Sequence, residues 1–490
     1  MDLSDLERER LKKVERLRAR GIEPYPARVA RTHTNLDAIA VFEAAEPNRA
    51  EVRATVTGRM ALFRTMGRAS FAHLEDSTGR LQLYFKKDAI GDDAYQMLLT
   101  DVDLGDFLEA SGTLFRTKTG EVTLQVAAFR LIAKAITPPP EKWHGLKDVE
   151  IRYRQRYADL ISNPEVRDVF RTRARIVSAL RRFLDDRGFL EVETPILQPI
   201  YGGAAARPFV THHNQLRQDL YLRISFELYL KRLLVGMYDR VYEIGRDFRN
   251  EGVDRTHSPE FSMLEFYAAY LDYTDVMRLT EEMIAAVAQE VLGTTRMVSG
   301  GQAIELAPPW TRLTLREALV EHVDIDYLQY PDADSLRAAI RSQGGHAPND
   351  ATWGKLIEGL LGDHVEPKLI QPTFLYDYPR DISPLAKRKP GDDLHVERFE
   401  FFIGGVEMGN AFTELNDPID QEQRFHDMAR LYGAEDAEAH PMDEDYLRAM
   451  RYGMPPNGGF GMGIDRLTML FAGKDTIREV VLFPHLRARE

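Results

Sequence analysis

The sequence predicts an α+β protein in two parts, a small closed β-barrel followed by a larger domain of helices and strands. Three observations support this fold class. Residues 51–137 alternate apolar and polar side chains in short runs. Residues 138–150 open with three consecutive prolines and mark a boundary. From residue 151 to 490, helical patterns and strand-like runs alternate, and a chain of 490 residues has room for two or three domains.

The composition excludes several classes of function. Because the chain has no cysteine, a disulfide framework, a thiolate zinc site, an iron–sulfur cluster and a cysteine nucleophile are excluded. The first residues are charged rather than apolar, and no run approaches the roughly 18 apolar residues of a membrane span. A net charge of −13 argues against non-specific coating of nucleic acid or acidic membranes. We therefore expect a cytoplasmic protein with no membrane partner.

The first 50 residues are expected to hold a basic helix and a lead-in segment. Residues 3–20 carry apolar side chains at helical spacing, and Gly21 is a plausible stop. Such a helix is either simply solvated or contacts phosphate groups. Its basic side chains are Arg8, Lys12, Lys13, Arg16, Arg18 and Arg20.

Residues 51–137 are expected to form the barrel. Turn signals at STGR and KTGE separate roughly five short strands. That number of strands in about 85 residues is typical of an OB-fold. The segment 138–150 then follows as a stiff linker to the second domain.

The segment RDFRNEGVDRTHSPEFSMLEFY, residues 246–267, is expected to form two strands around a polar loop. Arg249 and Glu251 share a face of the first strand, and an arginine beside a carboxylate suits a polyanion that arrives with a cation. A half-buried strand with one exposed glutamate would also explain the second strand. One face of that strand carries Phe261, Met263, Glu265 and Tyr267.

The segment 398–417 contains a Gly404-Gly405 hairpin signal. If these glycines form the loop, Phe402 pairs with Glu407, and Glu400 lies diagonally across from Glu407 at about 7–8 Å. Two carboxylates that close repel unless a cation lies between them or one is protonated. Oxygen ligands favour Mg²⁺, although two solvated surface glutamates are the simpler alternative.

Asn410 and Glu414 have the opposite strand parity to Glu407. For all three to face one pocket, the strand needs a one-residue bulge, and Gly409 is the expected place for it.

The segment NGGFGMGIDRLTMLF, residues 457–471, has four glycines before Asp465-Arg466 and an apolar helix. It matches neither a Walker loop nor G-x-G-x-x-G. The glycines are either a tight turn or leave backbone room beside Arg466 for a flat or anionic ligand.

In this order, the segments resemble motifs 1, 2 and 3 of the class II aminoacyl-tRNA synthetases: a helix and strand entering Pro195, then FRNE…H…PEF, then GGFGMGIDR. The family's catalytic domain is an antiparallel sheet flanked by helices, which implies that fold for residues 151–490. Residues 274–366 are mostly helical and poor in motifs, as an insertion would be. The barrel narrows the resemblance to the aspartyl, asparaginyl and lysyl subgroup.

Four further segments resemble the lysyl-tRNA synthetases of bacterial type: YGGAAARPF, ISFELYLKRL, ISPLAK and EMGNAFTELND. The resemblance implies ATP-dependent ligation of L-lysine to tRNA(Lys) through a lysyl-adenylate, with release of pyrophosphate and then AMP. It also implies a homodimer through motif 1. Ser258 and Asp381 depart from the family, which usually has asparagine and glutamate there.

The resemblance also implies roles for individual residues. Arg249, Glu251 and Arg466 are the catalytic set, in which Arg249 holds the α-phosphate and the lysine carboxylate. ATP contacts also come from His257, Phe261, Glu400 and Glu407, with Phe261 stacked under adenine. Glu400 and Glu407 match magnesium ligands, with more than one Mg²⁺ ion expected. Residues matching the lysine site are Gly203 and Glu227 at the α-amino group, Glu265, Tyr267 and Glu414 at the side-chain ammonium, and Asn410 nearby.

In the barrel, the resemblance implies that Phe71 stacks on an anticodon base and Gln82 reads a base edge, with Arg64 as a further candidate. Phe71 as a core aromatic is the alternative. Three other functions remain open: a relative specific for aspartate or asparagine, a non-catalytic nucleic-acid-binding protein, and a lysine ligase that acts on a protein.

Overall fold

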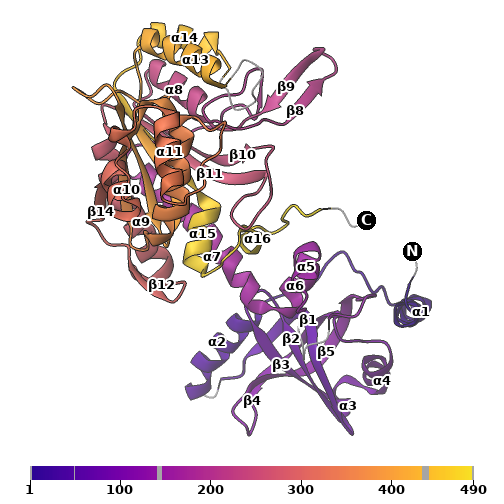
Figure 1. The fold of residues 1–490 in the computed structure, drawn as a ribbon. Coiled ribbons are helices and arrows are strands. Elements are labelled where there is room, and N and C mark those ends of the chain that lie inside the picture. The colour runs from indigo at the N-terminus through magenta and orange to yellow at the C-terminus, as the bar shows by residue number, and fades with distance from the viewer. Residues whose placement is uncertain (1–2, 49, 141–145, 433–440, 488–490) are drawn as a thin grey trace. The chain divides into compact units, whose positions relative to one another are not determined.

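The computed structural model describes residues 3–48, 50–140, 146–432 and 441–487. It divides into two compact units, Met1–Lys147 and Asp148–Glu490 (Figure 1). Part of the predicted linker, residues 141–145, lies outside the described residues. Among the helices that are described, none combines the length and apolarity needed to cross a membrane.

The first unit is built on a closed five-stranded barrel with strand order β1-β2-β3-β5-β4, so the predicted OB-fold is confirmed. Alternate side chains of β2 and β3 point into the barrel core, as the period-two pattern predicts. Its strands are β1 (Arg53–Met66), β2 (Ala69–Glu75), β3 (Arg80–Lys86), β4 (Phe107–Arg116) and β5 (Val122–Ala133). Its helices are α1 (Asp5–Ala19), α2 (Asn35–Ala45), α3 (Lys87–Ile90) and α4 (Asp92–Thr100).

The cations of α1 have carboxylate partners within the same unit. Lys13 Nζ lies 2.7 Å from Asp103, and Arg16 and Arg20 lie 3.0 and 3.3 Å from Asp101. Arg10 lies 4.0 Å from Asp103, and Arg8, Lys12 and Arg18 pair with acidic residues of α1 or just after it. The pairs with Asp101 and Asp103 hold the helix on the barrel unit, while Arg8, Lys12 and Arg18 are exposed. For these exposed cations, the solvated and the phosphate-contacting interpretations both stay predictions.

The second unit is built on an eight-stranded sheet with strand order β14-β15-β16-β17-β18-β11-β10-β6. Every neighbouring pair is antiparallel except β14 with β15 and β10 with β6, at the two edges. The predicted antiparallel sheet is therefore confirmed. The strands are β6 (Leu190–Glu191), β10 (Arg240–Phe248), β11 (Glu260–Ala269), β14 (Thr311–Thr314), β15 (Thr373–Pro379), β16 (His395–Ile403), β17 (Val406–Thr413) and β18 (Asn457–Gly463).

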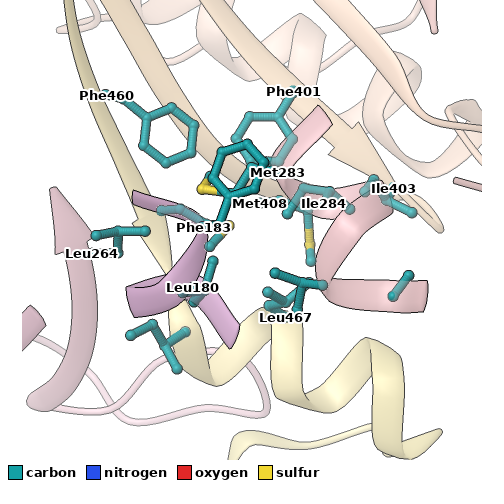
Figure 2. Close-up of a cluster of buried hydrophobic side chains, with 14 of the residues drawn as sticks. Leu180, Phe183, Leu264, Met283, Ile284, Phe401, Ile403, Met408, Phe460 and Leu467 are labelled. Atoms are coloured by element: carbon teal, nitrogen blue, oxygen red, sulfur yellow. The ribbon is translucent and has the colours of Figure 1, made fainter. Parts of the chain in front are cut away.

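Three helices cover one face of this sheet: α7 (Pro164–Asp185), α9 (Tyr273–Leu292) and α15 (Ile464–Ala472). Figure 2 shows Phe183 of α7, Met283 of α9 and Leu467 of α15 converging near Phe401 and Phe460 of the sheet. Because side chains alternate along a strand, the residues between these core positions point to the opposite face. That opposite face carries the candidate site.

Within residues 274–366, α9 packs into the main core and β14 joins the sheet edge. The rest builds a separate core that also includes residues of β15 and β16. Its helices are α10 (Leu315–Val323), α11 (Ala333–Ser342) and α12 (Trp353–Leu360). The hairpin of β12 (Arg296–Ser299) and β13 (Gln302–Glu305) packs instead on the main core, through Met297 and Ile304.

The remaining elements of this unit are short. A three-stranded sheet, β7-β9-β8, consists of β7 (Leu197–Gln198), β8 (Val210–His213) and β9 (Gln218–Leu222). The helices are α5 (Val149–Arg154), α6 (Arg156–Ser162), α8 (Glu227–Val235), α13 (Pro418–Tyr432), α14 (Glu444–Arg451) and α16 (Ile477–Val480).

Candidate active site

Two cavities adjoin on the face of the sheet opposite the helices. The first is about 390 Å³ and is lined by both polar and apolar side chains, and the second is about 220 Å³. Both are lined by Arg249, Met263, Asn410 and Gly461, so the two cavities share one wall.

The glycine run forms the floor of the cavities. Residues 457–463 are the strand β18, between β11 and β17, so the tight-turn alternative is wrong. A Cβ on Gly459 would overlap the Glu414 carboxylate and the Tyr267 ring. Gly461 lies between Glu265 of β11 and Asn410 of β17. The missing side chains therefore make room for acidic and phenolic groups from the neighbouring strands.

The predicted shared face of β11 is confirmed, because Phe261, Met263, Glu265 and Tyr267 all line the cavities. Strand β10, however, ends at Phe248, so Arg249 and Glu251 follow the strand rather than share one of its faces. The Arg249 guanidinium lies 5.1 Å from the centre of the Phe261 ring. The Arg249 side chain can therefore contact ligands in both cavities.

The hairpin of β16 and β17 has the predicted Phe402–Glu407 pairing. Its bulge is one residue earlier than predicted, because Phe401 pairs with Gly409 and leaves Met408 as the extra residue. Met408 turns into the core, as Figure 2 shows. A glycine is needed at 409 for a different reason: a Cβ there would overlap the Gly461 carbonyl oxygen of β18.

Beyond the bulge, Asn410 pairs with Glu400 and faces the cavities together with Glu407. Phe412 and Glu414 line the first cavity in the same way. The bulge therefore brings residues of opposite strand parity to one face, as predicted from the sequence.

The two hairpin glutamates each have an arginine partner. Glu400 accepts hydrogen bonds from Tyr378 at 2.8 Å and from Arg398 at 2.5 Å, and it does not line either cavity. Glu407 lies 3.0 Å from Arg466 and lines the second cavity. Burial raises the pKa of Glu400 to about 7 against the opposing charge of Arg398, and the charge of Glu407 raises it further. Glu407 is therefore close enough for its charge to act on Glu400.

The first cavity ends in three buried carboxylates. Glu265 accepts hydrogen bonds from Ser225 Oγ at 2.9 Å and from the Tyr267 hydroxyl at 3.2 Å. Glu227 and Glu414 share one cation, Lys231, whose Nζ lies 2.5 Å from Glu227. Burial raises the pKa of Glu265 well above its usual range and that of Glu414 to about 8. Carboxylates buried at this density favour a cationic ligand.

Gly203 closes the wall near these groups. Its φ of +88° is in the left-handed region, and a Cβ would lie 2.9 Å from Ser225 Oγ. In the second cavity, His257 Nε2 lies 3.4 Å from an Arg466 nitrogen, and Arg466 also donates to the Glu407 carbonyl at 2.7 Å.

Comparison with known proteins identifies the family. Residues 148–487 match the model of "tRNA synthetases class II (D, K and N)". The chain belongs to this family. Residues 54–132 match the OB-fold nucleic acid binding domain of anticodon-binding type.

This class II synthetase is similar over its full length to proteins named lysine–tRNA ligase. It is 56% identical to that of Roseiflexus castenholzii over 491 residues, covering 100% of both chains. It is 52% identical to that of Chloroflexus aurantiacus, covering 100% of this chain and 99% of the relative. It is also 52% identical to that of Moorella thermoacetica, covering 99% of each.

In the barrel of this synthetase, Phe71, Gln82 and Arg64 lie outside the core. Strand register places Phe71 opposite both Arg64 and Tyr84, and the Phe71 and Tyr84 rings are 4.9 Å apart. Gln82 donates to Glu121 at 2.7 Å. The alternative that Phe71 is a core aromatic is wrong, because the buried barrel cluster contains the alternate residues of β2 instead.

Sequence reasoning missed several residues that the fold brings to the synthetase site. Ser225 and Arg398 line the first cavity and bind Glu265 and Glu400 respectively. Lys231 is the most consequential omission. Its spacing of four residues from Glu227 on a helix was the available signal.

Proposed function

We propose that this synthetase ligates L-lysine to tRNA(Lys), using ATP and a lysyl-adenylate intermediate. The observation that carries the proposal is a cavity lined by three buried carboxylates and, in the wall that it shares with the second cavity, by Arg249. A lysine has two ammonium groups and one carboxylate, so its charges complement this arrangement. An aspartate-specific site would instead need an accessible, unpaired cation beside these carboxylates. Lys231 is fully buried behind the lining residues, and Arg398, which lines the cavity, is paired with Glu400.

In this proposal, Glu265, Tyr267 and Glu414 bind the side-chain ammonium of lysine, with Asn410 nearby. The neutral partners of Glu265 support its role, since a hydroxyl can rotate away while an ion-paired cation would compete with the substrate. Gly203 and Glu227 bind the α-amino group.

ATP would lie in the second cavity, with adenine stacked on Phe261 and contacts from Glu251, His257 and Arg466. Arg249 lines both cavities, which supports contacts to both the lysine carboxylate and the α-phosphate. The lysine carboxylate is itself the nucleophile, so the site needs alignment and charge stabilisation rather than a general base.

In this proposal, Glu400 and Glu407 hold a magnesium ion shared with the nucleotide; Glu407 lines the second cavity, and Glu400 lies on the neighbouring strand of the same hairpin. Both offer only oxygen ligands, and among the described residues no group of three or more acidic, histidine or cysteine side chains converges on one point. Mg²⁺ typically takes one or two carboxylates together with phosphate oxygens. When bound, Mg²⁺ would neutralise phosphate charge. We expect more than one ion.

The tRNA would bind through the barrel, with Phe71 stacking on an anticodon base, Gln82 reading a base edge and Arg64 close to the nucleic acid. A homodimer and a cytoplasmic location complete the proposal. We infer both from the family. The dimer is inferred because motif 1 forms a twofold interface in that family.

Lysine-dependent exchange of pyrophosphate into ATP, measured against a panel of amino acids, tests the function. We expect exchange with lysine and not with aspartate or asparagine, followed by transfer to tRNA(Lys). Exchange with aspartate or asparagine instead would identify a different amino-acid specificity. If activated lysine were transferred only to protein, the acceptor would be a protein rather than tRNA. If no amino acid supported exchange, the chain would be a non-catalytic nucleic-acid-binding protein.

A further inference from the structure

Lys231 is a fully buried cation directly behind the acidic end of the first cavity. It lies on α8, with Nζ 2.5 Å from Glu227 and in an ion pair with Glu414. It also lies 5.8 Å from the centre of the Tyr267 ring. All three partners line the cavity, while Lys231 does not. A positively charged side chain of the protein therefore lies behind these carboxylates, on the side that faces away from the cavity.

Arg398 also lines this cavity, but its charge is matched by its own partner, Glu400. The remaining charges near the three carboxylates balance when Lys231 is counted. Glu227, Glu265 and Glu414 supply three carboxylates. A lysine ligand brings two ammonium groups, and Lys231 is the third. Without it, one buried carboxylate would keep a proton or lack a counterion, both of which are costly in a desolvated site.

A purely structural role does not explain this arrangement well. Burying an ion pair brings little net stability, because desolvation offsets the attraction between the charges. The chain contains a useful comparison in Lys134, which is equally buried and pairs with Asp103 and Asp106 of the barrel unit. None of these three residues lines a described cavity, whereas both carboxylates that Lys231 holds line the candidate lysine site.

We propose that Lys231 is a positioning residue that determines specificity, acting as a built-in third ammonium. It fixes Glu227 and Glu414 in the geometry that receives the ligand and leaves the site two negative charges for two ligand ammonium groups. The ligand class that fits is an α-amino acid with one further side-chain ammonium. This inference rests on the proposed lysine substrate and deepens it.

Lys231 is faced by Glu227, Glu414, Tyr446 and Tyr267, and Arg398 and Glu265 act in turn on Glu227 and Tyr267. Glu414 follows β17, Glu265 and Tyr267 lie on β11, Tyr446 lies on α14, and Arg398 lies on β16. Lys231 opposes the rise that burial causes in the pKa of both Glu227 and Glu414. Removing it should therefore leave more protons on these carboxylates, and a binding lysine would have to displace them.

The test uses the full chain and four variants: Lys231→Met, Glu414→Gln, the double variant of both, and Lys134→Met as the control for losing a buried lysine. Calorimetry at pH 7 gives the lysine Kd and, in two buffers of different ionisation enthalpy, the number of protons released. ATP affinity and melting temperature are measured alongside.

For Lys231→Met we expect the lysine Kd to rise about 100-fold, as when one partner of a buried pair is removed. About one more proton should be released on binding than in the wild type, with ATP affinity within about twofold. The double variant restores two carboxylates for two ligand ammonium groups. It should bind lysine more tightly than either single variant. Lys134→Met should lower the melting temperature without changing the lysine Kd.

The inference is overturned if Lys231→Met keeps its lysine Kd and proton release, or if the double variant binds more weakly than both single variants. An equal loss in Lys134→Met would also overturn it. Should Lys231→Met not fold, the comparison of the double variant with Glu414→Gln carries the test. Failure of the wild type to bind lysine is a separate result, which would reject the proposed function itself.

Discussion

Glu265 is a buried carboxylate surrounded by neutral hydrogen-bond donors. Ser225, Tyr267 and the backbone N–H of Phe226 point at it, and no ion pair to it is found in the described part of the chain. Glu227 and Glu414, in contrast, already share Lys231. The charge of Glu265 is therefore the one most open to the ammonium of a ligand.

Glu265→Gln should raise the lysine KM by orders of magnitude. The change keeps the shape of the side chain but removes a charge from a desolvated pair, which typically costs about 2–5 kcal/mol. ATP affinity should change little. Pyrophosphate exchange over a range of lysine concentrations measures the effect. Neutral isosteres of lysine serve as control ligands, because they have no side-chain charge that could pair with Glu265. Normal activation of lysine by the variant would contradict this role.

Asp247 is a second buried carboxylate, just before the site. No hydrogen-bond donor reaches either of its oxygens among the described residues, and the Arg223 Nε atom is 3.5 Å away. Burial raises the pKa of Asp247 to about 7, although Arg223 and Arg249 oppose the rise. The unfolded value is about 3.9. The folded state therefore binds the proton more tightly, and stability falls as the pH rises from about 4 to 7.

Asp247→Asn should increase the free energy of unfolding by about 2 kcal/mol at pH 8. Near pH 5 the increase should be smaller, because Asp247 then keeps its proton in the folded state and only the unfolded state is ionised. Denaturant unfolding of both proteins at the two pH values measures the difference. A variant that is less stable at pH 8 would mean that the ionised carboxylate is compensated by its arginine neighbours.

At the scale of elements, the hairpin of β16 and β17 carries the candidate magnesium ligands. Glu400→Gln and Glu407→Gln should each raise the Mg²⁺ concentration needed for adenylate formation, because each removes an anionic ligand. A magnesium titration of pyrophosphate exchange measures the shift, and Glu397→Gln on β16 is the control. Since both glutamates are held by arginines, circular dichroism and melting must accompany the titration. An unshifted requirement in both variants would reject the site.

The glycine strand β18 is the second element on which the site depends. Gly459→Ala should weaken lysine binding by about tenfold or more, since its Cβ would overlap Glu414 and Tyr267 and packed sites tolerate added volume poorly. ATP affinity should fall less, because Gly459 lines only the first cavity. Gly359→Ala is the control, as a Cβ there meets nothing within 4 Å. Isothermal titration with each ligand separates the effects, and equal losses for lysine and ATP would contradict a local clash.

For the whole molecule, the candidate sites for tRNA and for lysine lie in different compact units. Phe71→Ala in the barrel should weaken tRNA binding by about 1–3 kcal/mol, the usual contribution of stacking on one base. Lysine activation without tRNA should be unchanged. Filter binding and pyrophosphate exchange measure the two properties. Phe129→Ala, which removes an aromatic that packs against the barrel core, controls for loss of barrel stability. Damage of equal size to both properties would reject the stacking role.

The sequence by itself determined the main pieces of this molecule. Period-two alternation is a local property, so it predicted the barrel strands and the shared face of β11. The Gly404-Gly405 turn predicted the Phe402–Glu407 pairing, because turn and register are neighbours in the chain. The resemblance to class II synthetases then assigned the family, which full-length relatives support.

Only the tertiary structure decided which groups meet. The extra residue of the bulge is Met408 because Gly409 must pass close to β18, a strand about 50 residues away in sequence. The glycine run is a strand because it pairs with β11 on one side and β17 on the other, and Gly459 leaves the space that Glu414 and Tyr267 fill. Lys231 could not be assigned from its helix alone, since its second partner, Glu414, lies beyond the hairpin. Charge balance in a buried site depends on residues distant in the chain, and no local pattern encodes it.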